Sequence, residues 1–349
     1  MRYRELGRTG LKVSEIGFGT IPVLSGNVPV LPDYYSPDTE EAVAIMQHAY
    51  QLGCNLYDTA IPEEYGDAEY KLGVFAERVG REHIIISDKA RFMDGNDMFR
   101  EVLRSAETLG TRPDIYFVHQ VDEKNQEETF SRYGALDALC DLKKAGIIQF
   151  TGIATHYYSV AERAARDSRV DVIQTSGNIL ERGIMDRIAA DCIFREKGLI
   201  LNKVYAAGCL LRVFQPAELI GGILHYPFSS ALIGIGTIPQ ADAAMEAETA
   251  PAEFSFDAVI RRLSAHFSPM ACTRCQRCIC PHGYEVHILL RQFNYYHLGK
   301  YYWAMKKLRM NIEEVCERCR RCTDQRCMRD CPQHLRIPEL IAQIGELAR

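Results

Sequence analysis

No stretch of the 349-residue sequence reaches the unbroken apolar length that a transmembrane helix needs. The opening residues Met1–Glu5 include two arginines and a glutamate, and no apolar run follows them, so a secretory signal is not expected. The predicted location is the cytoplasm, with no membrane partner. Hydrophobic residues make up 47% and charged residues 25% of the chain, which is typical of a globular protein.

A dominant charge of one sign is also missing, because the net charge is only −5. The charge is nevertheless uneven: residues 1–270 hold 27 basic and 38 acidic residues, whereas residues 271–349 hold 14 and 8. A basic terminal segment suggests either a nucleic-acid partner or compensation of a bound anionic group. Its basic residues are interspersed with cysteines, which favours the second interpretation, and we expect no nucleic-acid partner.

Residues 1–240 alternate short apolar segments with longer segments of helical periodicity. Eight segments are predicted to be strands: Ser14–Gly19, Cys54–Asp58, His83–Lys89, Asp114–His119, Gln149–Ala154, Asp171–Thr175, Leu199–Val204 and Ala231–Ile235. Eight strands alternating with helices favour an α/β fold of the (β/α)8 TIM barrel type. An open doubly wound sheet is the alternative, but no GxGxxG motif follows the first strand, which argues against its dinucleotide-binding form.

Residues 241–255 are small, acidic and weakly patterned, and we place a domain boundary at their end. The prediction is a barrel domain of residues 1–255 followed by a small α-rich domain of residues 256–349. Helices are predicted over Phe256–His266 and Glu285–Met310 in the second domain.

Cysteine distinguishes the two predicted domains. Four of the thirteen cysteines lie in the first 270 residues, isolated and in apolar or helical surroundings, where thiols usually pack as small hydrophobes. The other nine lie between Cys272 and Cys331. Because a reducing cytosol disfavours disulfides, such clustering indicates metal or cluster ligands.

The nine cysteines form two motifs. They are Cys272-x2-Cys275-x2-Cys278-x-Cys280-Pro281 and Cys316-x2-Cys319-x2-Cys322-x4-Cys327-x3-Cys331-Pro332. Both resemble the C-x2-C-x2-C-x3-C-P motif of dicluster ferredoxins, in which three thiolates hold one cluster and the fourth reaches the other. The first motif has one residue instead of three before Cys-Pro, and the second has an extra cysteine. The resemblance implies a ferredoxin-like iron–sulfur domain with two [4Fe–4S] clusters.

Two ligand sets are compatible with the second motif. In one set, a cluster is held by Cys280, Cys316, Cys319 and Cys327. The other cluster is then held by Cys272, Cys275, Cys278 and Cys331, and Cys322 is spare. The alternative uses Cys322 and leaves Cys327 spare. Structural zinc also takes paired C-x2-C motifs, but it does not require three cysteines at this spacing followed by Cys-Pro, twice over. Seven arginines among the ligands could offset the cluster charge: Arg274, Arg277, Arg318, Arg320, Arg321, Arg326 and Arg329.

The first 250 residues resemble the aldo-keto reductases. The similarity begins in MRYRELGRTGLKVSEIGFGT and continues through NLYDTAIPEEYGDAEYKLG, IIISDKA, DIYFVHQVD, LCDLKKAGIIQFTGIATH, DVIQTSGNIL and ALIGIGTIPQADAAMEA. The best-matched blocks fall at successive predicted strand ends, where the catalytic residues of a barrel gather. Family members with a C-terminal dicluster ferredoxin extension resemble both halves of the chain.

The resemblance implies a catalytic tetrad of Asp58, Tyr65, Lys89 and His119. A free tyrosine is a poor acid at neutral pH, and a nearby Lys⁺ lowers its pKa by favouring the phenolate. Asp58 would hold Lys89, and His119 would orient the carbonyl oxygen. Each residue could instead be structural, but their joint position at successive strand ends favours catalysis. The family usually places its tyrosine five residues after the aspartate, and here the separation is seven. Glu63, Glu64 and Tyr57 are the local alternatives to Tyr65, although none fits the motif as well.

The resemblance also implies a site for NADP or NAD. The residues implicated are Thr155, His156, Gln174, Asn178, Gly236, Thr237 and Gln240. The last three follow the eighth strand, where backbone N–H groups and a helix N-terminus suit phosphate. No basic residue for the 2′-phosphate of NADP is evident near residues 240–248, so the choice between the two cofactors stays open.

The sequence thus predicts an oxidoreductase that interconverts a small carbonyl and an alcohol by nicotinamide hydride transfer. The clusters would relay electrons, with a redox protein as the electron partner. Because nicotinamide moves two electrons and each cluster one, an alternative is a nicotinamide-independent reductase fed by the two clusters, with Tyr34 and Tyr35 near its pocket. A further alternative is a non-catalytic electron-transfer subunit whose barrel is a scaffold.

Overall fold

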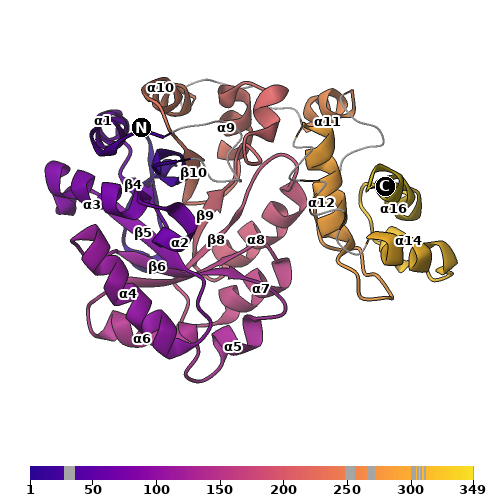
Figure 1. Cartoon of the computed structure of the whole chain (residues 1–349), viewed down its shortest axis with the longest axis horizontal. Helices are drawn as coiled ribbons and strands as arrows, with labels where there is room; N and C mark the ends of the chain where they lie inside the picture. The colour runs from indigo at the N-terminus through magenta and orange to yellow at the C-terminus, as the bar shows by residue number, and fades with distance from the viewer. Residues whose placement is uncertain are drawn as a thin grey trace.

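The computed structural model describes residues 1–26, 36–247, 256–265, 272–299, 304, 306, 309 and 312–348, so that Tyr34 and Tyr35 lie outside the described residues. Eight parallel strands close into a barrel in the order β10-β3-β4-β5-β6-β7-β8-β9 (Figure 1). The strands are β3 (Ile16–Gly19), β4 (Leu56–Asp58), β5 (Ile85–Ala90), β6 (Ile115–Val121), β7 (Phe150–Thr155), β8 (Val172–Ser176), β9 (Gly198–Asn202) and β10 (Ser230–Gly234). The predicted barrel is confirmed, and each predicted strand overlaps an observed one.

Helices surround the barrel. They are α1 (Thr39–Gln51), α2 (Pro62–Tyr65), α3 (Ala68–Val79), α4 (Gly95–Leu109), α5 (Gln126–Phe130), α6 (Ala135–Lys144), α7 (Tyr158–Arg166), α8 (Arg182–Phe194), α9 (Pro216–Leu224) and α10 (Ile238–Glu246). Local sequence sets where they begin. At α1, the Asp38 carboxylate accepts the Glu41 N–H, and the Glu41 carboxylate accepts the Asp38 N–H, which forms a capping box.

The barrel interior is filled by apolar side chains that point inward from the strands, including Leu56, Phe117 and Ile200. A short hairpin of β1 (Tyr3–Glu5) and β2 (Lys12–Ser14) adds Leu6 and Val13 to this cluster. The Asn55 side chain, directly before β4, bonds the Ser14 N–H and the Lys12 carbonyl. The hairpin therefore covers the end of the barrel where the strands begin, and the opposite end is left for chemistry.

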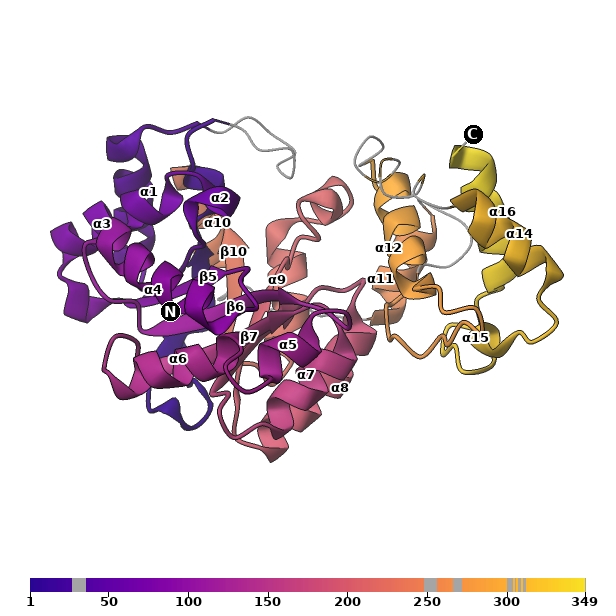
Figure 2. The ribbon, with the colours of Figure 1, turned by 60° about the horizontal axis from the view of Figure 1, so that its bottom comes forward.

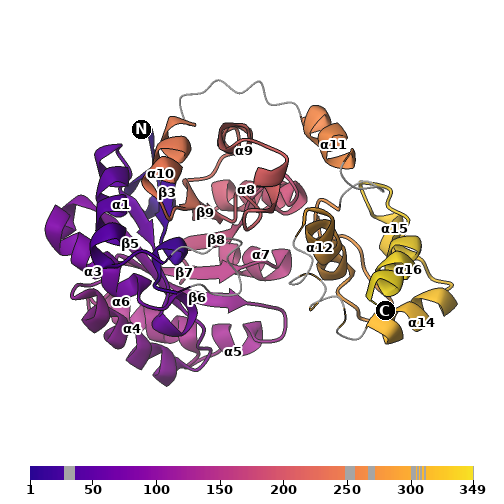
Figure 3. The same cartoon turned by 45° about the horizontal axis from the view of Figure 1, so that its top comes forward.

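The C-terminal region contains helices only, among the described residues. They are α11 (Phe256–Ser264), α12 (Val286–His297), α14 (Ile312–Arg321), α15 (Arg326–Arg329) and α16 (Ile337–Ala348). The helix predicted over Glu285–Met310 is too long, because α12 ends at His297 and Gly299 then adopts a φ of 93°, which breaks a helix. In Figures 2 and 3, α12 lies between the barrel and the pair α14 and α16.

Two further apolar clusters organise this region. One joins barrel loops to the C-terminal helices, since Leu180 and Phe214 pack with Leu263 of α11 and Tyr295 of α12. The other is formed by α12, α14 and α16 and includes buried cysteines. Among the described residues, no helix is long and apolar enough to cross a membrane.

Candidate active site

Asp58 and Lys89 form a buried ion pair where neighbouring strands β4 and β5 end. Lys89 Nζ lies 2.5 Å from Asp58 Oδ2 and donates to the Thr59 carbonyl. Asp58 is 4% exposed and Lys89 is 1% exposed, so water does not screen the pair. The other carboxylate oxygen of Asp58 accepts hydrogen bonds from Ser87 Oγ at 2.7 Å and Gln174 Nε2 at 2.9 Å.

This arrangement keeps Lys89 charged. Burial alone disfavours the ammonium form, but the attraction of Asp58 outweighs burial and the pKa of Lys89 is raised. The result is a fixed positive charge inside the barrel mouth, held by two oxygen partners.

Tyr65 reaches this charge although it follows Asp58 by two residues more than expected. The extra residues form α2, which begins at Pro62 and ends at Tyr65. The Ile61 N–H donates to the Lys89 carbonyl at 3.2 Å and the Tyr65 N–H donates to the Ile61 carbonyl at 3.0 Å, which ties the short helix to β5. Lys89 Nζ then lies 5.0 Å from the centre of the Tyr65 ring.

The environment of Tyr65 favours its protonated form. Burial raises the pKa of Tyr65, and Lys89 lowers it, while Asp58 and Glu64 raise it again. Lys89 therefore lowers the pKa of Tyr65, as expected, but by less than burial, Asp58 and Glu64 together raise it. At neutral pH the phenol is a proton donor beside a cation that stabilises the phenolate as it forms.

His119 completes the group from β6. The pairing of β6 with β7 shifts register between Val118 and Val121, and Gln120 has a φ of 55°, so a bulge sets the direction of the histidine. His119 Nδ1 lies 2.5 Å from Glu64 Oε2. Burial lowers the pKa of His119 despite Glu64, which leaves a neutral imidazole at pH 7.

Glu64 is the one member of this group that the tetrad prediction does not include. The residue is adjacent to Tyr65 in sequence, and its position on the one-turn helix α2 brings it to His119. The sequence offered Glu64 only as an alternative to Tyr65, and the structure pairs it with His119 instead.

The expected nicotinamide residues of strands β7 and β8 bond to protein atoms. Gln174 bridges Asp58 and Asn202 through its amide. Asn178 accepts the N–H groups of Leu180 and Glu181 and donates to the Lys203 carbonyl. Thr155 Oγ1 donates to the Val121 carbonyl at 2.6 Å. These side chains therefore shape the loops at the strand ends.

The expected phosphate loop follows β10 as predicted. The Gly236 N–H donates to Gln240 Oε1 at 2.8 Å, and Thr237 caps α10 by accepting the Gln240 N–H at 3.3 Å. The structure brings the three residues together at the N-terminus of a nine-residue helix.

His156 lies at a contact between the barrel and residues 272–280, which we call the first cysteine segment. Its ring Nε2 is 2.7 Å from Lys203 Nζ, and its carbonyl accepts from Arg274 Nη2 and Gln276 Nε2, both at 2.8 Å. Burial lowers the pKa of His156 well below its usual range, and the neighbouring cations lower it further. His156 therefore faces the C-terminal region through its backbone and the barrel mouth through its ring.

A buried charge bridge holds the same contact. Glu181, which directly precedes α8, lies 2.9 Å from Arg274 Nη1 and 2.8 Å from Arg291 Nε of α12. Glu181 is 2% exposed and Arg274 is 1% exposed. Burial tends to raise the pKa of Glu181, but the attraction of Arg274 and Arg291 outweighs burial, and the pKa of Glu181 is lowered to about 2. We name Arg274, Glu181 and Arg291 the Glu181 bridge. The spacing of the sequence motifs did not indicate this contact.

The first cysteine segment packs closely on α8 beside this bridge. The Gly183 N–H donates to the Thr273 carbonyl at 3.1 Å, and Arg187 Nη1 donates to the Cys275 carbonyl at 3.0 Å. A Cβ atom at Gly183 would lie 2.5 Å from Cβ of Cys275, so this position has no room for a side chain.

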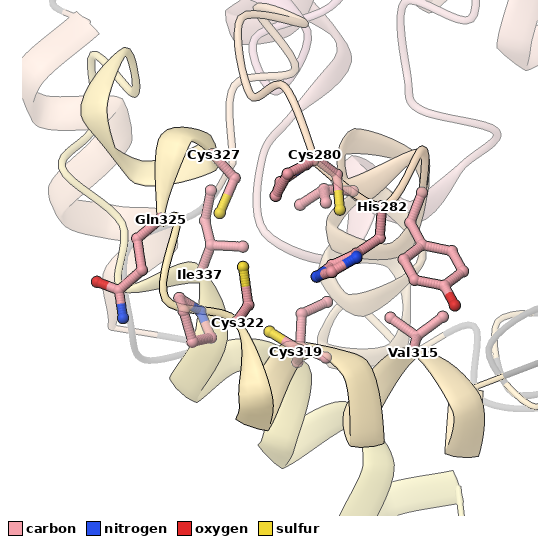
Figure 4. Close-up of a pocket in the computed structure, with 13 residues that line it drawn as sticks. Cys280, His282, Val315, Cys319, Cys322, Gln325, Cys327 and Ile337 are labelled. Atoms are coloured by element: carbon pink, nitrogen blue, oxygen red, sulfur yellow. The ribbon is translucent and has the colours of Figure 1, made fainter.

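Residues 316–331, which we call the second cysteine segment, enclose a cavity together with the end of the first cysteine segment at Cys280. Four thiols line it, together with Val286, Val315 and Ile337 (Figure 4); they belong to Cys280, Cys319, Cys322 and Cys327. Cys316 does not line the cavity, although the ligand sets expected from the sequence include it. Among the described residues, no three His, Cys, Asp or Glu side chains are gathered as ligands of one metal ion.

Comparison with known proteins gives a consistent picture of the barrel. The sequence model of the Aldo/keto reductase family matches residues 15–210. D-threo-aldose 1-dehydrogenase from Pseudomonas sp is 24% identical over 234 residues, which cover 58% of this chain and 68% of the relative. L-galactose dehydrogenase from Arabidopsis thaliana is 34% identical over 160 residues, which cover 43% of this chain and 47% of the relative. The chain thus spans about two thirds of the length of the first relative and about half of the second.

Solved structures agree with these matches. An aldo-keto reductase from Pseudomonas aeruginosa has a TM-score of 0.60 and 26% identity, and the alignment covers 70% of this chain and 95% of that one. The holo form of an aldo-keto reductase from Bacillus halodurans has a TM-score of 0.62, covering 74% and 93%, with 20% identity, so this likeness concerns the fold alone.

Proposed function

Because the chain belongs to the aldo/keto reductase family, we propose that it interconverts a carbonyl and an alcohol at the barrel mouth, with Tyr65 as the acid and base. The observation that carries this proposal is the buried pair Asp58–Lys89 with Lys89 Nζ 5.0 Å from the Tyr65 ring. The chain is an oxidoreductase of this family; the roles of its individual residues and its substrate are our proposals.

Each side chain has a distinct role in the proposed reaction. During reduction, the phenol of Tyr65 gives its proton to the carbonyl oxygen, and during oxidation the phenolate takes the proton from the alcohol. Lys89, fixed by Asp58, stabilises the phenolate. Glu64 lies 2.5 Å from Nδ1 of His119 and holds the single ring proton of the neutral imidazole on that nitrogen, so His119 positions the substrate oxygen by contact and does not donate to it. A nicotinamide, when bound, supplies or takes up the hydride.

Nicotinamide binding is inferred from the family. The side chains expected to bind it fit this role if they exchange a hydrogen bond to protein for one to the cofactor. A bound carboxamide would take over one bond that Gln174 or Asn178 makes to protein. A bound phosphate would displace Gln240 Oε1 from the Gly236 N–H. Anaerobic titration with NADPH and with NADH, followed by nicotinamide fluorescence, tests binding and identifies the cofactor.

The test of the catalytic role is Tyr65→Phe. We expect turnover to fall by at least about 100-fold, because general acid–base catalysis contributes about that much or more. Aldoses, including L-galactose from the name of one relative, are suitable probes with NAD⁺ or NADP⁺. Tyr70→Phe on the exposed face of α3 is the matched control and should keep full activity. Unchanged turnover of Tyr65→Phe would show that Tyr65 is not the acid and base, and absence of turnover in the wild-type chain would support a barrel that acts as a scaffold.

We also propose that the chain divides after residue 255 and that residues 256–349 form a ferredoxin-like domain with two [4Fe–4S] clusters. The cavity lined by four thiols supports cluster binding, as do the cysteine motifs. When bound, the clusters would supply single electrons. Iron and acid-labile sulfide analysis of anaerobically purified protein tests this; zinc in place of iron would contradict it.

A second candidate function follows from the contact between the first cysteine segment and the barrel. Arg274 and Gln276, which flank Cys275, bond the carbonyl of His156 at the end of β7. This proximity favours a reductase that takes electrons from the clusters and protons from Tyr65, with no nicotinamide. Failure of both nicotinamides to bind a protein with full iron content would favour this candidate.

A further inference from the structure

The nine cysteines of the C-terminal region occupy three different environments. Four of them share the apolar cavity of Figure 4, and they come from both segments: Cys280 from the first, and Cys319, Cys322 and Cys327 from the second. In Figure 4 their sulfur atoms face the space between α14, the α15 segment and the Cys280 loop. Apolar side chains, such as Ile337 and Ile341, line the rest of this space.

A second set of four lies on the barrel side of the region. Cys275 lines another cavity together with Pro332 and Gln333, the two residues that follow Cys331. The Cys331 thiol is an electrostatic neighbour of Cys272, Cys275 and Cys278. The backbone N–H of Arg274 donates to Cys272 Sγ at 3.3 Å, an interaction typical of a ligand thiolate.

Cys316 is an electrostatic neighbour of Cys319, but it does not line the cavity that the other four thiols share. It lies on α14, where it is 8% exposed and packs in the apolar cluster with Leu340 and Ile344 of α16. Its Sγ is 3.3 Å from the Ile341 carbonyl, and a Cβ atom at Gly345 would lie 2.5 Å from that sulfur. Cys316 is thus a core residue at the contact between two helices.

We propose that Cys280, Cys319, Cys322 and Cys327 hold one [4Fe–4S] cluster, that Cys272, Cys275, Cys278 and Cys331 hold the other, and that Cys316 is not a ligand. This proposal rests on the proposed function, because it presupposes that the region binds such clusters. Each cluster takes three thiolates from one segment and its fourth from the other, as in dicluster ferredoxins. The second motif is then C-x2-C-x4-C-x3-C-P, beginning at Cys319, which differs from both ligand sets considered from the sequence alone.

Helix geometry explains the distinction between Cys316 and Cys322. Cys316 and Cys319 lie three residues apart on α14, but Cys316 is directed at α16 while Cys319 lines the cavity. Cys322 follows the last residue of α14, where the backbone turns toward the cavity. A cluster ligated by Cys316 would require its sulfur to leave the Ile341 carbonyl of α16.

Single serine variants at Cys316, Cys322 and Cys327 test the assignment. Each is reconstituted anaerobically as the full chain, and iron, acid-labile sulfide and the electron paramagnetic resonance of the reduced protein are measured. Wild type and Cys316→Ser should both hold about eight iron atoms and give the same spectrum. Cys322→Ser and Cys327→Ser should each lose about half of the iron and the signal of one cluster.

Controls separate this assignment from the proposed function. Cys209→Ser, a buried thiol in a different apolar cluster, reports the general cost of a hydroxyl in the core. If Cys316→Ser does not fold, Cys316→Ala removes the sulfur without adding a polar group. Loss of one cluster from Cys316→Ala, with Cys322→Ser fully loaded, would overturn the assignment while leaving iron–sulfur binding intact. A wild-type chain without iron would instead overturn the proposed function and the assignment with it.

Discussion

The barrel and the cysteine-rich region bury polar groups in different ways. In the barrel, the buried charges are matched by protein: Lys89 has Asp58 and the Thr59 carbonyl, and both charges lie inside a large apolar core. In the C-terminal region, four thiols instead face a shared cavity together with apolar side chains. The barrel therefore pairs its buried charges within the polypeptide, whereas the cavity gathers groups that could bind a cofactor.

The largest expected effect is on removal of iron. An apolar core as small as that between α12, α14 and α16 gives little stability alone, and regions of this size usually need a metal or disulfides. We expect anaerobic chelation to abolish amide protection in residues 312–348 and to leave the barrel strands protected. Hydrogen exchange read by mass spectrometry measures both parts in one sample. Retained protection in α14 and α16 after loss of iron would remove the contrast between the two regions.

A smaller effect is expected from breaking the Glu181 bridge by Glu181→Gln. The change leaves Arg274 and Arg291 buried without their carboxylate, and breaking a buried pair in this way costs about 3–5 kcal/mol. We expect faster hydrogen exchange at residues 156–158 and a lower unfolding midpoint in urea.

Glu317→Gln is the matched control for the bridge, since its partner Arg321 is exposed. Exposed pairs contribute about 0–1 kcal/mol, and the control should be nearly silent. An equal loss of stability in both variants would show that the contact between the regions does not depend on this charge.

A gradual effect, no larger than about 1.4 kcal/mol for each pH unit, concerns a pair of carboxyls on the outer side of β5. Glu69 of α3 and Asp88 are both fully buried. Burial is the larger cause, and repulsion by Asp88 the next, of a pKa of Glu69 that is raised to about 10. The folded state therefore keeps a proton that the unfolded state releases above its ordinary pKa near 4.5. Stability should fall as the pH rises from about 4.5 to about 10, by at most about 1.4 kcal/mol per pH unit.

Glu69→Gln should flatten this dependence, because an amide has no proton to release. Urea unfolding at pH 5.5, 7 and 8.5 compares the slopes of the two proteins. Glu107→Gln, a change on the neighbouring helix α4 that lies outside the pair, should keep the wild-type slope. A variant as pH-dependent as wild type would assign the effect to other groups.

The sequence predicted the barrel well, because strand-end residues such as Asp58 and Lys89 lie in blocks whose spacing follows the alternation of strands and helices. It also predicted the tetrad residues that the structure brings together. It could not show how Tyr65 reaches Lys89, since that depends on α2 closing back on β5. It also left open which of Cys316, Cys322 and Cys327 could share a site, because only the fold shows that Cys322 and Cys327 line the cavity and that Cys316 does not. The helix at Glu285–Met310 was predicted too long because its apolar pattern continues beyond the turn at Gly299.

The interleaving of the two cysteine segments has a consequence for biosynthesis. Cys331 completes the set that begins at Cys272, and Cys280 completes the set that ends at Cys327, so neither set is whole until both segments have been synthesised. The barrel precedes them in the chain, and domains generally fold in order from the N-terminus. A nascent chain would therefore already offer Glu181 and the His156 carbonyl to Arg274 before the last thiols emerge. Cofactor insertion would then be a late step that takes place on a preformed surface of the same molecule.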